Sequence, residues 1–426
     1  MDRRTVFLGK FRFNVDSRMS RFAMALVMVF ALTLLTTHAI EAQTFSVLHN
    51  FSGEGDGANP YAGLTVTSSG VLYGTATYGG TYNNYGTVFK LSQVSSSWVF
   101  SPLFEFAGNI DGANPEGGVV IGPNGALYGT AEVRGAANDG TVFELRPPAT
   151  FCGSILCYWN EFVLYTFAGA PADGAGPQVE NLVFDQAGNI YGTTEEGGTY
   201  GDGTVFELTP SGQGYMESIL HNFGSGSDGL YPYSGVVLDT AGNVYGTTYA
   251  GGTGAAGTVY QLVPSNGGWV ENVLVNFGGT NGDGPFSNLI IDASGNLYGT
   301  TYGGGQNGGG VVFKLAPSEG GFAYSVLYTF SEYCDSWGGV AIDTAGDFFG
   351  VCSFGGAHDD GWIFELTNCS QGCTLVDLHD FSGSDGANPY GSPTLDAHGN
   401  LYGTTVYGGT NDGGVVWEIA GVGAQH

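Results

Sequence analysis

Two segments near residue 350 combine aromatic and acidic side chains in a way that suits the binding of a flat, polar molecule. The first reads Glu332-Tyr-Cys-Asp-Ser-Trp337, and the second reads Gly355-Gly-Ala-His-Asp-Asp-Gly-Trp362. Aromatic rings can stack on the apolar face of a sugar, and carboxylates can accept hydrogen bonds from its hydroxyls. The candidate ligand-binding residues are Tyr333, Asp335, Trp337, His358, Asp359, Asp360 and Trp362.

The same segments leave room for catalysis, because glycoside hydrolysis needs two carboxyl groups. Asp359 and Asp360 are the candidate catalytic residues for a hydrolase or a lyase. The chain contains no Gly-x-Ser-x-Gly, no phosphate-binding or dinucleotide loop and no His-Glu-x-x-His, which favours a protein that is not an enzyme. A third interpretation is a diverged repeat unit that has no ligand and is held by a disulfide.

A second recurring segment, Asp-Gly-Ala-Asn-Pro and its variants, offers oxygen atoms that calcium prefers. The candidate calcium ligands are Asp56, Asn59, Asp111, Asn114, Asp385 and Asn388. Asp-Gly and Asn-Pro are also ordinary turn residues, so a purely structural role is the simpler interpretation. No cofactor is required for the predicted function. The histidines His49, His221 and His379 occupy equivalent strand positions and are interpreted as packing residues.

These segments belong to a repeat of about 50 residues, which indicates one structural unit copied and stacked. Each unit contains a Tyr-Gly-Thr core or a variant of it, and the cores start at Tyr73, Tyr128, Tyr191, Tyr245, Tyr298, Phe349 and Tyr402. Around each core lie four short runs rich in β-branched and aromatic residues, bounded by Gly, Asn, Asp and Pro. The sequence therefore predicts an all-β, seven-bladed β-propeller with four antiparallel strands per blade. An open β-solenoid is the alternative.

The phase of the repeat predicts how the ring closes. Residues 45–51 match the fourth strand of a unit and residues 414–419 match the third, so the N-terminal strand should complete the last blade. Closure of this kind protects sheet edges. Because strand direction alternates, the Gly-Gly loops and the Asp-Gly-Ala-Asn-Pro loops should lie on one rim, the candidate binding face. The Tyr of each core should be buried, and its Gly should allow neighbouring sheets to approach closely.

The ends of the chain lie outside this repeat. Residues 1–42 combine basic residues, the apolar run 22–35 and small residues at Ala39 and Ala42, which is typical of a secretory signal peptide. A retained membrane anchor is the alternative. We therefore expect a signal peptide at 1–42, the propeller at 43–420 and a short tail at 421–426, with the protein secreted or held in the cell envelope.

Charge and cysteine content fit that location. The net charge is −29, and only Lys90, Arg134, Arg146 and Lys314 are basic outside residues 1–42. Such a surface excludes nucleic acid and anionic membranes as partners. The six cysteines suggest disulfides in an exported chain, with the pairs Cys152–Cys157, Cys334–Cys352 and Cys369–Cys373 expected. Zinc binding by the cysteines is the weaker alternative, because matching ligand pairs are missing.

The strings Gly-Asn-Leu-Tyr-Gly-Thr-Thr, Gly-Thr-Val-Phe-x-Leu and Asp-Gly-Ala-Asn-Pro resemble the Gloeo/Verruco (GloVer) tandem repeat of exported bacterial proteins across residues 44–420. The resemblance implies an exported repeat protein, with a propeller as its fold. Taken together, we expect a monomeric, non-enzymatic module that binds an extracellular glycan or protein through one rim and does not insert into the membrane after signal cleavage. The alternatives are a carbohydrate-active enzyme and a structural protein of the cell envelope.

Overall fold

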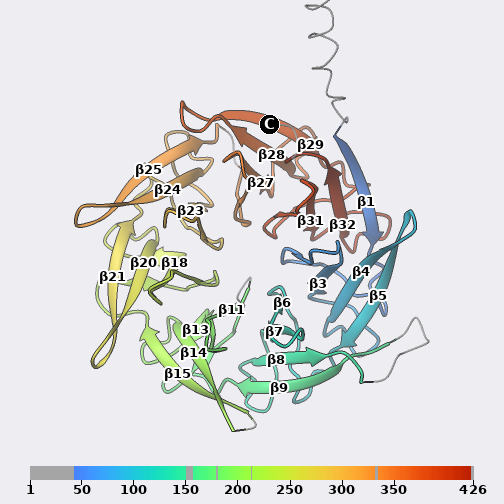
Figure 1. Ribbon diagram of the computed structural model, residues 1–426, viewed down its shortest axis with the longest axis horizontal. Coiled ribbons are helices and arrows are strands. Elements are labelled where there is room, and N and C mark those ends of the chain that lie inside the picture. Colours follow the sequence, from blue (N-terminus) through green and yellow to red (C-terminus); the bar gives the residue numbers. More distant parts are fainter. Residues whose placement is uncertain (1–42, 150–156, 179–180, 213, 332–333, 424–426) are drawn as a thin grey trace, which may run out of the picture. The chain divides into compact units, whose positions relative to one another are not determined.

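The computed structural model describes residues 43–149, 157–178, 181–212, 214–331 and 334–423, which form a ring of seven β-sheets (Figure 1). Each sheet has four antiparallel strands, and the described residues contain no helix. The predicted seven-bladed β-propeller is therefore confirmed. The expected signal peptide at 1–42 lies outside the described residues, and none of the described segments could span a membrane as a helix.

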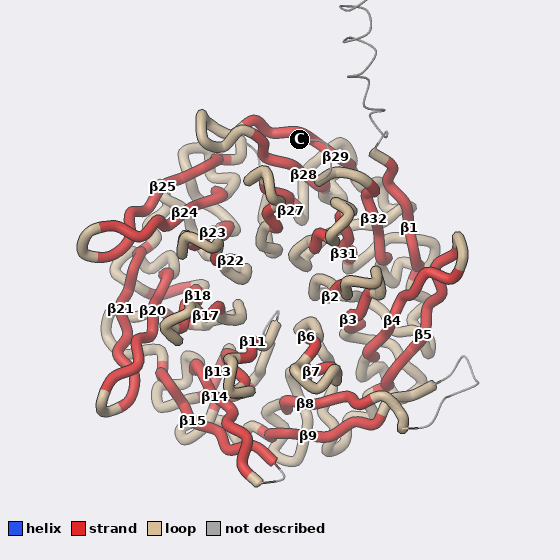
Figure 2. The backbone as a smooth tube through the Cα atoms, in the orientation of Figure 1, coloured by secondary structure: helices blue, strands red, loops and turns tan. Residues whose placement is uncertain are grey.

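The short first strand of each blade lies nearest the axis and the fourth lies on the outside (Figure 2). In that order, the first four blades consist of β2 (Thr65–Val66), β3 (Leu72–Ala76), β4 (Thr87–Val94) and β5 (Ser97–Glu105); β6 (Val120–Ile121), β7 (Leu127–Ala131), β8 (Thr141–Arg146) and β9 (Asn160–Thr166); β11 (Val183–Phe184), β12 (Ile190–Thr194), β14 (Thr204–Ser211) and β15 (Gly214–Asn222); and β17 (Val237–Leu238), β18 (Val244–Thr248), β20 (Thr258–Ser265) and β21 (Gly268–Asn276).

The remaining three blades close the ring. They consist of β22 (Ile290–Ile291), β23 (Leu297–Thr300), β24 (Val311–Ser318) and β25 (Gly321–Thr329); β26 (Ala341–Ile342), β27 (Phe348–Cys352), β28 (Trp362–Thr367) and β29 (Thr374–Asp380); and β30 (Thr394–Leu395), β31 (Leu401–Thr405), β32 (Val415–Ala420) and β1 (Thr44–Asn50). The N-terminal strand β1 pairs antiparallel with β32, with Phe45 opposite Ile419. The predicted closure of the last blade by the first strand is therefore confirmed.

The core lies between neighbouring blades. Between the fourth and fifth blades, Tyr245 and Phe277 pack with Leu297 and Phe313, and all four are buried. The hydroxyl of Tyr245 donates a hydrogen bond of 2.9 Å to Asp239 Oδ2 in the turn before its own strand. The tyrosine of the repeat thus fills the core and satisfies its hydroxyl locally, as expected for a buried phenol.

The glycine after that tyrosine has a different role from the one we expected. In β23, Gly299 lies opposite Phe313, and a Cβ added at Gly299 would be 2.7 Å from Phe313 Cζ. In all seven blades the nearest atom to such a Cβ belongs to the aromatic ring on the third strand of the same sheet. The expectation of close approach between neighbouring sheets is therefore wrong, because the glycine makes room for a ring inside its own sheet.

Two kinds of loop meet on one rim, as predicted. We call the segments between the fourth strand of one blade and the first strand of the next the inter-blade loops, and those between second and third strands the middle loops. Ala58 of an inter-blade loop bridges Tyr78 of a middle loop, and Ala387 bridges Tyr407 in the same way. The short pairs β10 (Gly174–Ala175) with β13 (Glu196–Gly197) and β16 (Gly229–Leu230) with β19 (Ala250–Gly251) repeat this contact.

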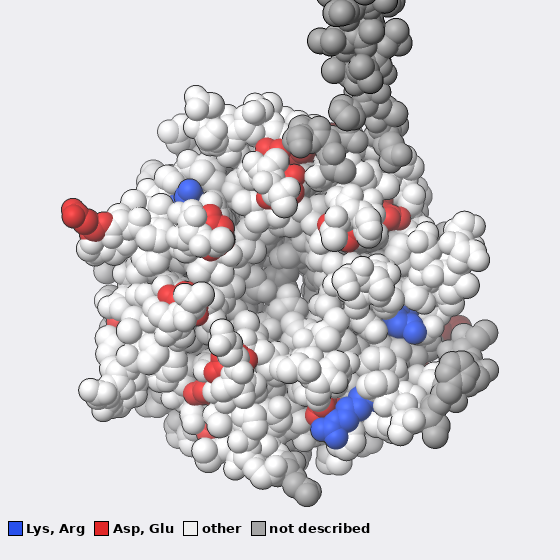
Figure 3. All heavy atoms as spheres, in the orientation of Figure 1, with Lys and Arg blue, Asp and Glu red and all other residues white. Residues whose placement is uncertain are grey.

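Disulfides join Cys334 to Cys352 and Cys369 to Cys373, both in or beside the sixth blade. Cys152 lies outside the described residues, so the third expected pair is not described. On the face shown in Figure 3, acidic groups are scattered around a central hollow and basic groups are few.

Candidate ligand-binding site at the axial mouth

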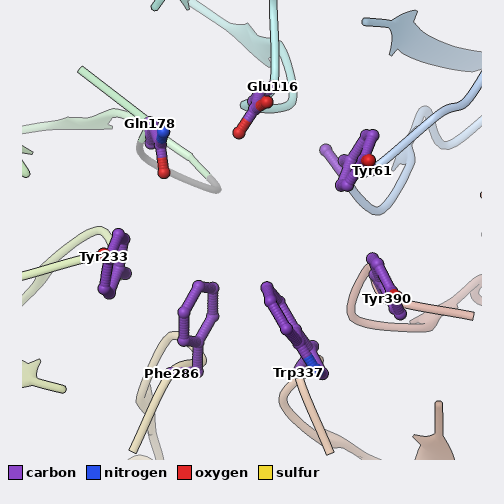
Figure 4. A pocket seen from close by; sticks show the side chains of 8 residues that line it. Tyr61, Glu116, Gln178, Tyr233, Phe286, Trp337 and Tyr390 are labelled. Carbon is purple, nitrogen blue, oxygen red and sulfur yellow. The ribbon is translucent and has the colours of Figure 1, made fainter. Parts of the chain in front are cut away.

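The inter-blade loops bring one side chain from every blade to the axis of the ring. In six loops this residue follows a proline, and in the sixth blade it follows Ser336. The seven residues, which we call the mouth residues, are Tyr61, Glu116, Gln178, Tyr233, Phe286, Trp337 and Tyr390. They point toward one another around a pocket of about 90 Å³ (Figure 4), which is room for part of a ligand and not for a large one.

The repeat sequence explains why these side chains reach the axis. Asn59, just before Pro60, has φ +53°, a left-handed conformation that asparagine tolerates. Its side-chain Nδ2 donates a hydrogen bond of 2.9 Å to the carbonyl oxygen of Val406 in the preceding blade. The threonine of the Tyr-Gly-Thr core adds a second tie, since Thr404 Oγ1 donates 2.8 Å to the carbonyl oxygen of Ala62. The mouth residue Tyr61 therefore lies between two fixed points.

The ties recur around the ring. Thr300 Oγ1 donates to the carbonyl oxygen of Gly338 at 3.0 Å, and Thr193 Oγ1 donates to that of Ser234 at 2.7 Å. In each case the acceptor follows a mouth residue directly, here Trp337 and Tyr233. The motif that defines the repeat thus positions the residue that varies between repeats.

Five mouth residues from consecutive blades form a continuous arc of rings, which we call the aromatic crescent: Tyr233, Phe286, Trp337, Tyr390 and Tyr61. Successive ring centroids are 4.5, 4.4, 4.8 and 5.6 Å apart, and the Tyr233–Phe286 and Trp337–Tyr390 pairs are stacked. All five side chains are only half-buried, so part of each ring remains open to a ligand.

A second layer of rings from the middle loops supports the crescent. Tyr249 packs edge-on against Tyr233 and Phe286, at 5.6 and 5.8 Å between centroids. Tyr302 packs edge-on against Trp337 at 6.2 Å. Because edge-to-face packing holds a ring in one orientation, the crescent is a pre-formed surface and needs little ordering on binding.

The other side of the mouth is polar. Glu116 and Gln178 complete the ring, and Gln178 Nε2 donates a hydrogen bond of 2.9 Å to Glu132 Oε1. The hydroxyl of Tyr233 donates 3.1 Å to Glu195 Oε1, which links the crescent to this polar side.

The carboxyl groups of the polar side hold protons unusually well. Burial, with the neighbouring Glu132 as the next cause, raises the pKa of Glu116 to about 8. Burial also raises the pKa of Glu195 to about 7, although the hydrogen bond from Tyr233 opposes the shift. A protonated carboxyl can donate as well as accept a hydrogen bond, so the polar side offers both functions to a ligand.

The structure separates the residues that we predicted for ligand binding. Trp337 lines the mouth, whereas Trp362 lines a different pocket of about 240 Å³ beside Phe330 and Leu375. Asp335 is buried and burial raises its pKa. These three residues therefore do not form one platform.

The remaining predicted residues of the sixth blade lie in its middle loop or outside the description. His358 and Asp359 are exposed, and Asp359 Oδ1 accepts a hydrogen bond of 3.1 Å from the Gly355 amide. The carbonyl of Asp360 accepts 2.7 Å from the Asn388 amide. Tyr333 lies outside the described residues. Ligand binding or catalysis by these residues stays a prediction.

The candidate calcium residues have partners within the protein. Asp111 Oδ2 accepts a hydrogen bond of 2.6 Å from the Ala107 amide, and Asp56 and Asp385 accept from the amides of Ser52 and Ser382. The asparagines act separately: Asn114 Nδ2 donates to the carbonyl of Thr77 and Asn388 Nδ2 to that of Ser353, as Asn59 does to Val406. The aspartate hydrogen bonds stabilise turns, and the asparagine hydrogen bonds connect neighbouring blades. Calcium binding at these positions stays a prediction.

The sequence interpretation missed six of the seven mouth residues. The signal was present, since the position after the proline of the inter-blade loop is aromatic in most repeats, while the residue that follows it is small in most repeats. Only closure of the ring shows that these positions converge on one pocket.

Comparison with solved structures finds similar chains at low sequence identity. The extracellular domain of a protein proposed to be a one-component system from B. thetaiotaomicron matches with a TM-score of 0.52 and 13% identity, over 88% of this chain and 40% of that one. A protein from Bacteroides uniformis proposed to be a 6-phosphogluconolactonase matches with a TM-score of 0.49 and 15% identity, over 84% of this chain and 96% of that one. The chain thus spans less than half the length of the first of these proteins.

No curated protein matches the sequence. A family model does, at residues 28–178 and again at residues 160–338, and these two ranges together take in most of the chain. The protein belongs to the Gloeobacter/Verrucomicrobia repeat family.

Proposed function

We propose that this propeller is an exported, non-enzymatic binding module that holds an extracellular glycan at its axial mouth. The observation that carries the proposal is the aromatic crescent, five rings in contact from five consecutive blades. The axial C–H groups of a sugar form an apolar face that packs on such rings. Its hydroxyls then meet Glu116 and Gln178 on the polar side, where donors and acceptors both exist.

Export is supported by two disulfides, which persist in oxidising compartments. The fold-level likeness to an extracellular domain agrees with that location.

A carbohydrate-active enzyme is the second candidate, and one observation favours it. Glu116 and Glu195 have raised pKa values beside Glu132, and a carboxyl that holds its proton near neutral pH can act as a general acid. This version of the enzyme hypothesis uses the polar side of the mouth. The exposed Asp359 and the partly buried Asp360 are the alternative pair.

The test incubates purified protein with a panel of insoluble polysaccharides, with and without calcium, and scores both retention and released reducing ends. We expect retention on at least one polymer without release. Trp337→Ala should weaken retention tenfold or more, about 1.4 kcal/mol, because it interrupts the crescent. Trp362→Ala is the matched control, since Trp362 lines another pocket, and its retention should equal that of the wild type.

Three outcomes would overturn parts of the proposal. Equal losses for Trp337→Ala and Trp362→Ala would move the site away from the mouth to the sixth blade. Released reducing ends that disappear in Glu116→Gln would make the protein an enzyme. Absence of retention on every polymer would contradict the glycan proposal and turn attention to protein ligands.

A further inference from the structure

A group of metal-ligating side chains lies between the third and fourth blades, away from the mouth. His221 is in the outer strand β15, Asp228 follows in the inter-blade loop, and Glu271 is in the outer strand β21 of the next blade. One ligand atom from each lies within 4.8 Å of the other two. His221 Nε2 and Asp228 Oδ2 are 3.3 Å apart.

This combination occurs at one blade interface among the described residues, although its parts recur elsewhere. His49 and His379, at the position of His221, also contact the following aspartate. However, each is covered by a stacked ring from the outer strand of the next blade. Phe100 stacks on His49 at 4.0 Å between ring centroids, and Phe45 stacks on His379 at 3.6 Å. Those rings occupy the position that Glu271 holds at the third interface.

The preceding interface holds equivalent carboxyl groups without a histidine. There the hydroxyl of Tyr165 donates a hydrogen bond of 2.9 Å to Asp173 Oδ2, and Glu217 takes the position of Glu271. Tyrosine is a donor and a poor metal ligand, whereas neutral imidazole is a common ligand of zinc. The two interfaces therefore allow a comparison, within one chain, of a histidine and a tyrosine beside equivalent carboxyl groups.

Burial and incomplete hydrogen bonding at the third interface suit a cation. Asp228 is only 7% exposed, and Glu271 Oε1 is buried without a hydrogen-bond partner among the described residues. The carboxylate oxygens of Asp228 and Glu271 lie close enough to repel each other when both groups are ionised. A divalent cation would remove that repulsion and satisfy the unpaired oxygen.

We propose that His221, Asp228 and Glu271 bind one zinc ion, with a fourth position left for water or for a small anionic ligand. Tetrahedral zinc with bonds of about 2.0–2.1 Å places its ligand atoms about 3.3 Å apart. His221 and Asp228 already meet that separation, and Glu271 needs a side-chain movement of at most about 1.5 Å. The site joins two blades at their outer strands, so bound zinc would tie them together. It is independent of the glycan proposal.

The test is zinc titration of the chelator-treated protein by calorimetry, followed by thermal unfolding with and without zinc. We expect one zinc per chain and a rise in the unfolding temperature. Glu271→Gln should weaken zinc binding at least tenfold and abolish the thermal shift. Glu217→Gln is the matched control, because it changes the same position one blade earlier, beside Tyr165, and should bind zinc as the wild type does.

A second variant distinguishes loss of zinc binding from a failure to fold. His221→Tyr copies the arrangement that the preceding interface already uses, so it should fold and should lose zinc binding. No zinc binding by the wild-type protein would overturn the proposal. So would affinity that is unchanged in both Glu271→Gln and His221→Tyr, because the ion would then bind elsewhere.

Discussion

Three glutamates on consecutive outer strands should make the propeller less stable as the pH rises through neutrality. Glu161, Glu217 and Glu271 occupy the same position of β9, β15 and β21, and burial raises the pKa of each to about 7. The second cause in each case is the negative charge of an inter-blade aspartate, which for Glu217 is Asp173. Replacing Glu217 by glutamine should remove one third of this effect and keep the shape of the side chain.

The sign follows from the shift. A folded pKa above the unfolded value of 4.5 means that the folded state binds the proton more tightly, so the stabilisation is fully present below pH 4.5 and is lost as the pH rises through 7. A shift from 4.5 to about 7 corresponds to a ceiling of about 3.5 kcal/mol, at about 1.4 kcal/mol per pKa unit. Since Glu217 is only half-buried, solvent screening reduces the expected effect to about 1–2 kcal/mol.

The assay is urea unfolding of the wild type and Glu217→Gln at pH 5 and at pH 8, with chelator present. The free energy of unfolding of the variant relative to the wild type should rise by about 1–2 kcal/mol between the two pH values. Comparing the two proteins cancels the opposite contribution of His221 and His379, whose pKa values are lowered by burial.

Met216→Gln is the control, because Met216 is the exposed neighbour in the same strand and carries no charge. Its free energy of unfolding should follow the pH dependence of the wild type. If Glu217→Gln also follows the wild type at both pH values, the carboxyl of Glu217 is ionised throughout and the argument from burial is refuted.

Two further changes test the packing within the blades and the disulfide of the sixth blade. Gly299→Ala should lower the free energy of unfolding by about 1–3 kcal/mol, because the new Cβ would press on Phe313, whereas Gly267→Ala, with open space around it, should cost little in the same urea titration. Removing the Cys334–Cys352 disulfide, which links residues 18 apart, by serine substitution of both cysteines should cost about 3 kcal/mol. A reductant should then lower the unfolding midpoint of the wild type more than that of the variant, which keeps only the Cys369–Cys373 disulfide of the two described.

The fold could be predicted from the sequence because each repeat carries its own strand and turn signals. The phase of the repeat also predicted that β1 would complete the last blade beside β32. Counting the strands of each unit shows that the last unit lacks its fourth strand and that the chain begins with one. The side chain that packs against a given residue could not be predicted in this way. The glycine at 299 is required by an aromatic ring within its own sheet, and sequence position does not distinguish that ring from a neighbouring backbone.

The site was predicted only in part for a similar reason. Departures from the repeat pointed to Trp337 and Trp362 together, but these tryptophans line different pockets. The equivalent histidines were interpreted as packing residues, and the structure shows that they also contact the aspartates of the inter-blade loops. Contacts between a strand and the loop that follows it depend on the twist of the blade, which spacing alone does not give.

The repeat itself explains how a symmetric scaffold makes an asymmetric site. Asparagine and threonine fix each inter-blade loop through backbone acceptors of the neighbouring blade, so the mouth residue between them is free to vary without loss of the fold. Variation at that one position places aromatic rings on one arc of the mouth and Glu116 and Gln178 on the other. A ligand at the axis would therefore meet an apolar wall on one side and hydrogen-bonding groups on the opposite side. Under the proposed function, such a mouth would select a molecule with two unlike faces and fix its orientation, which a ring of seven identical residues could not do.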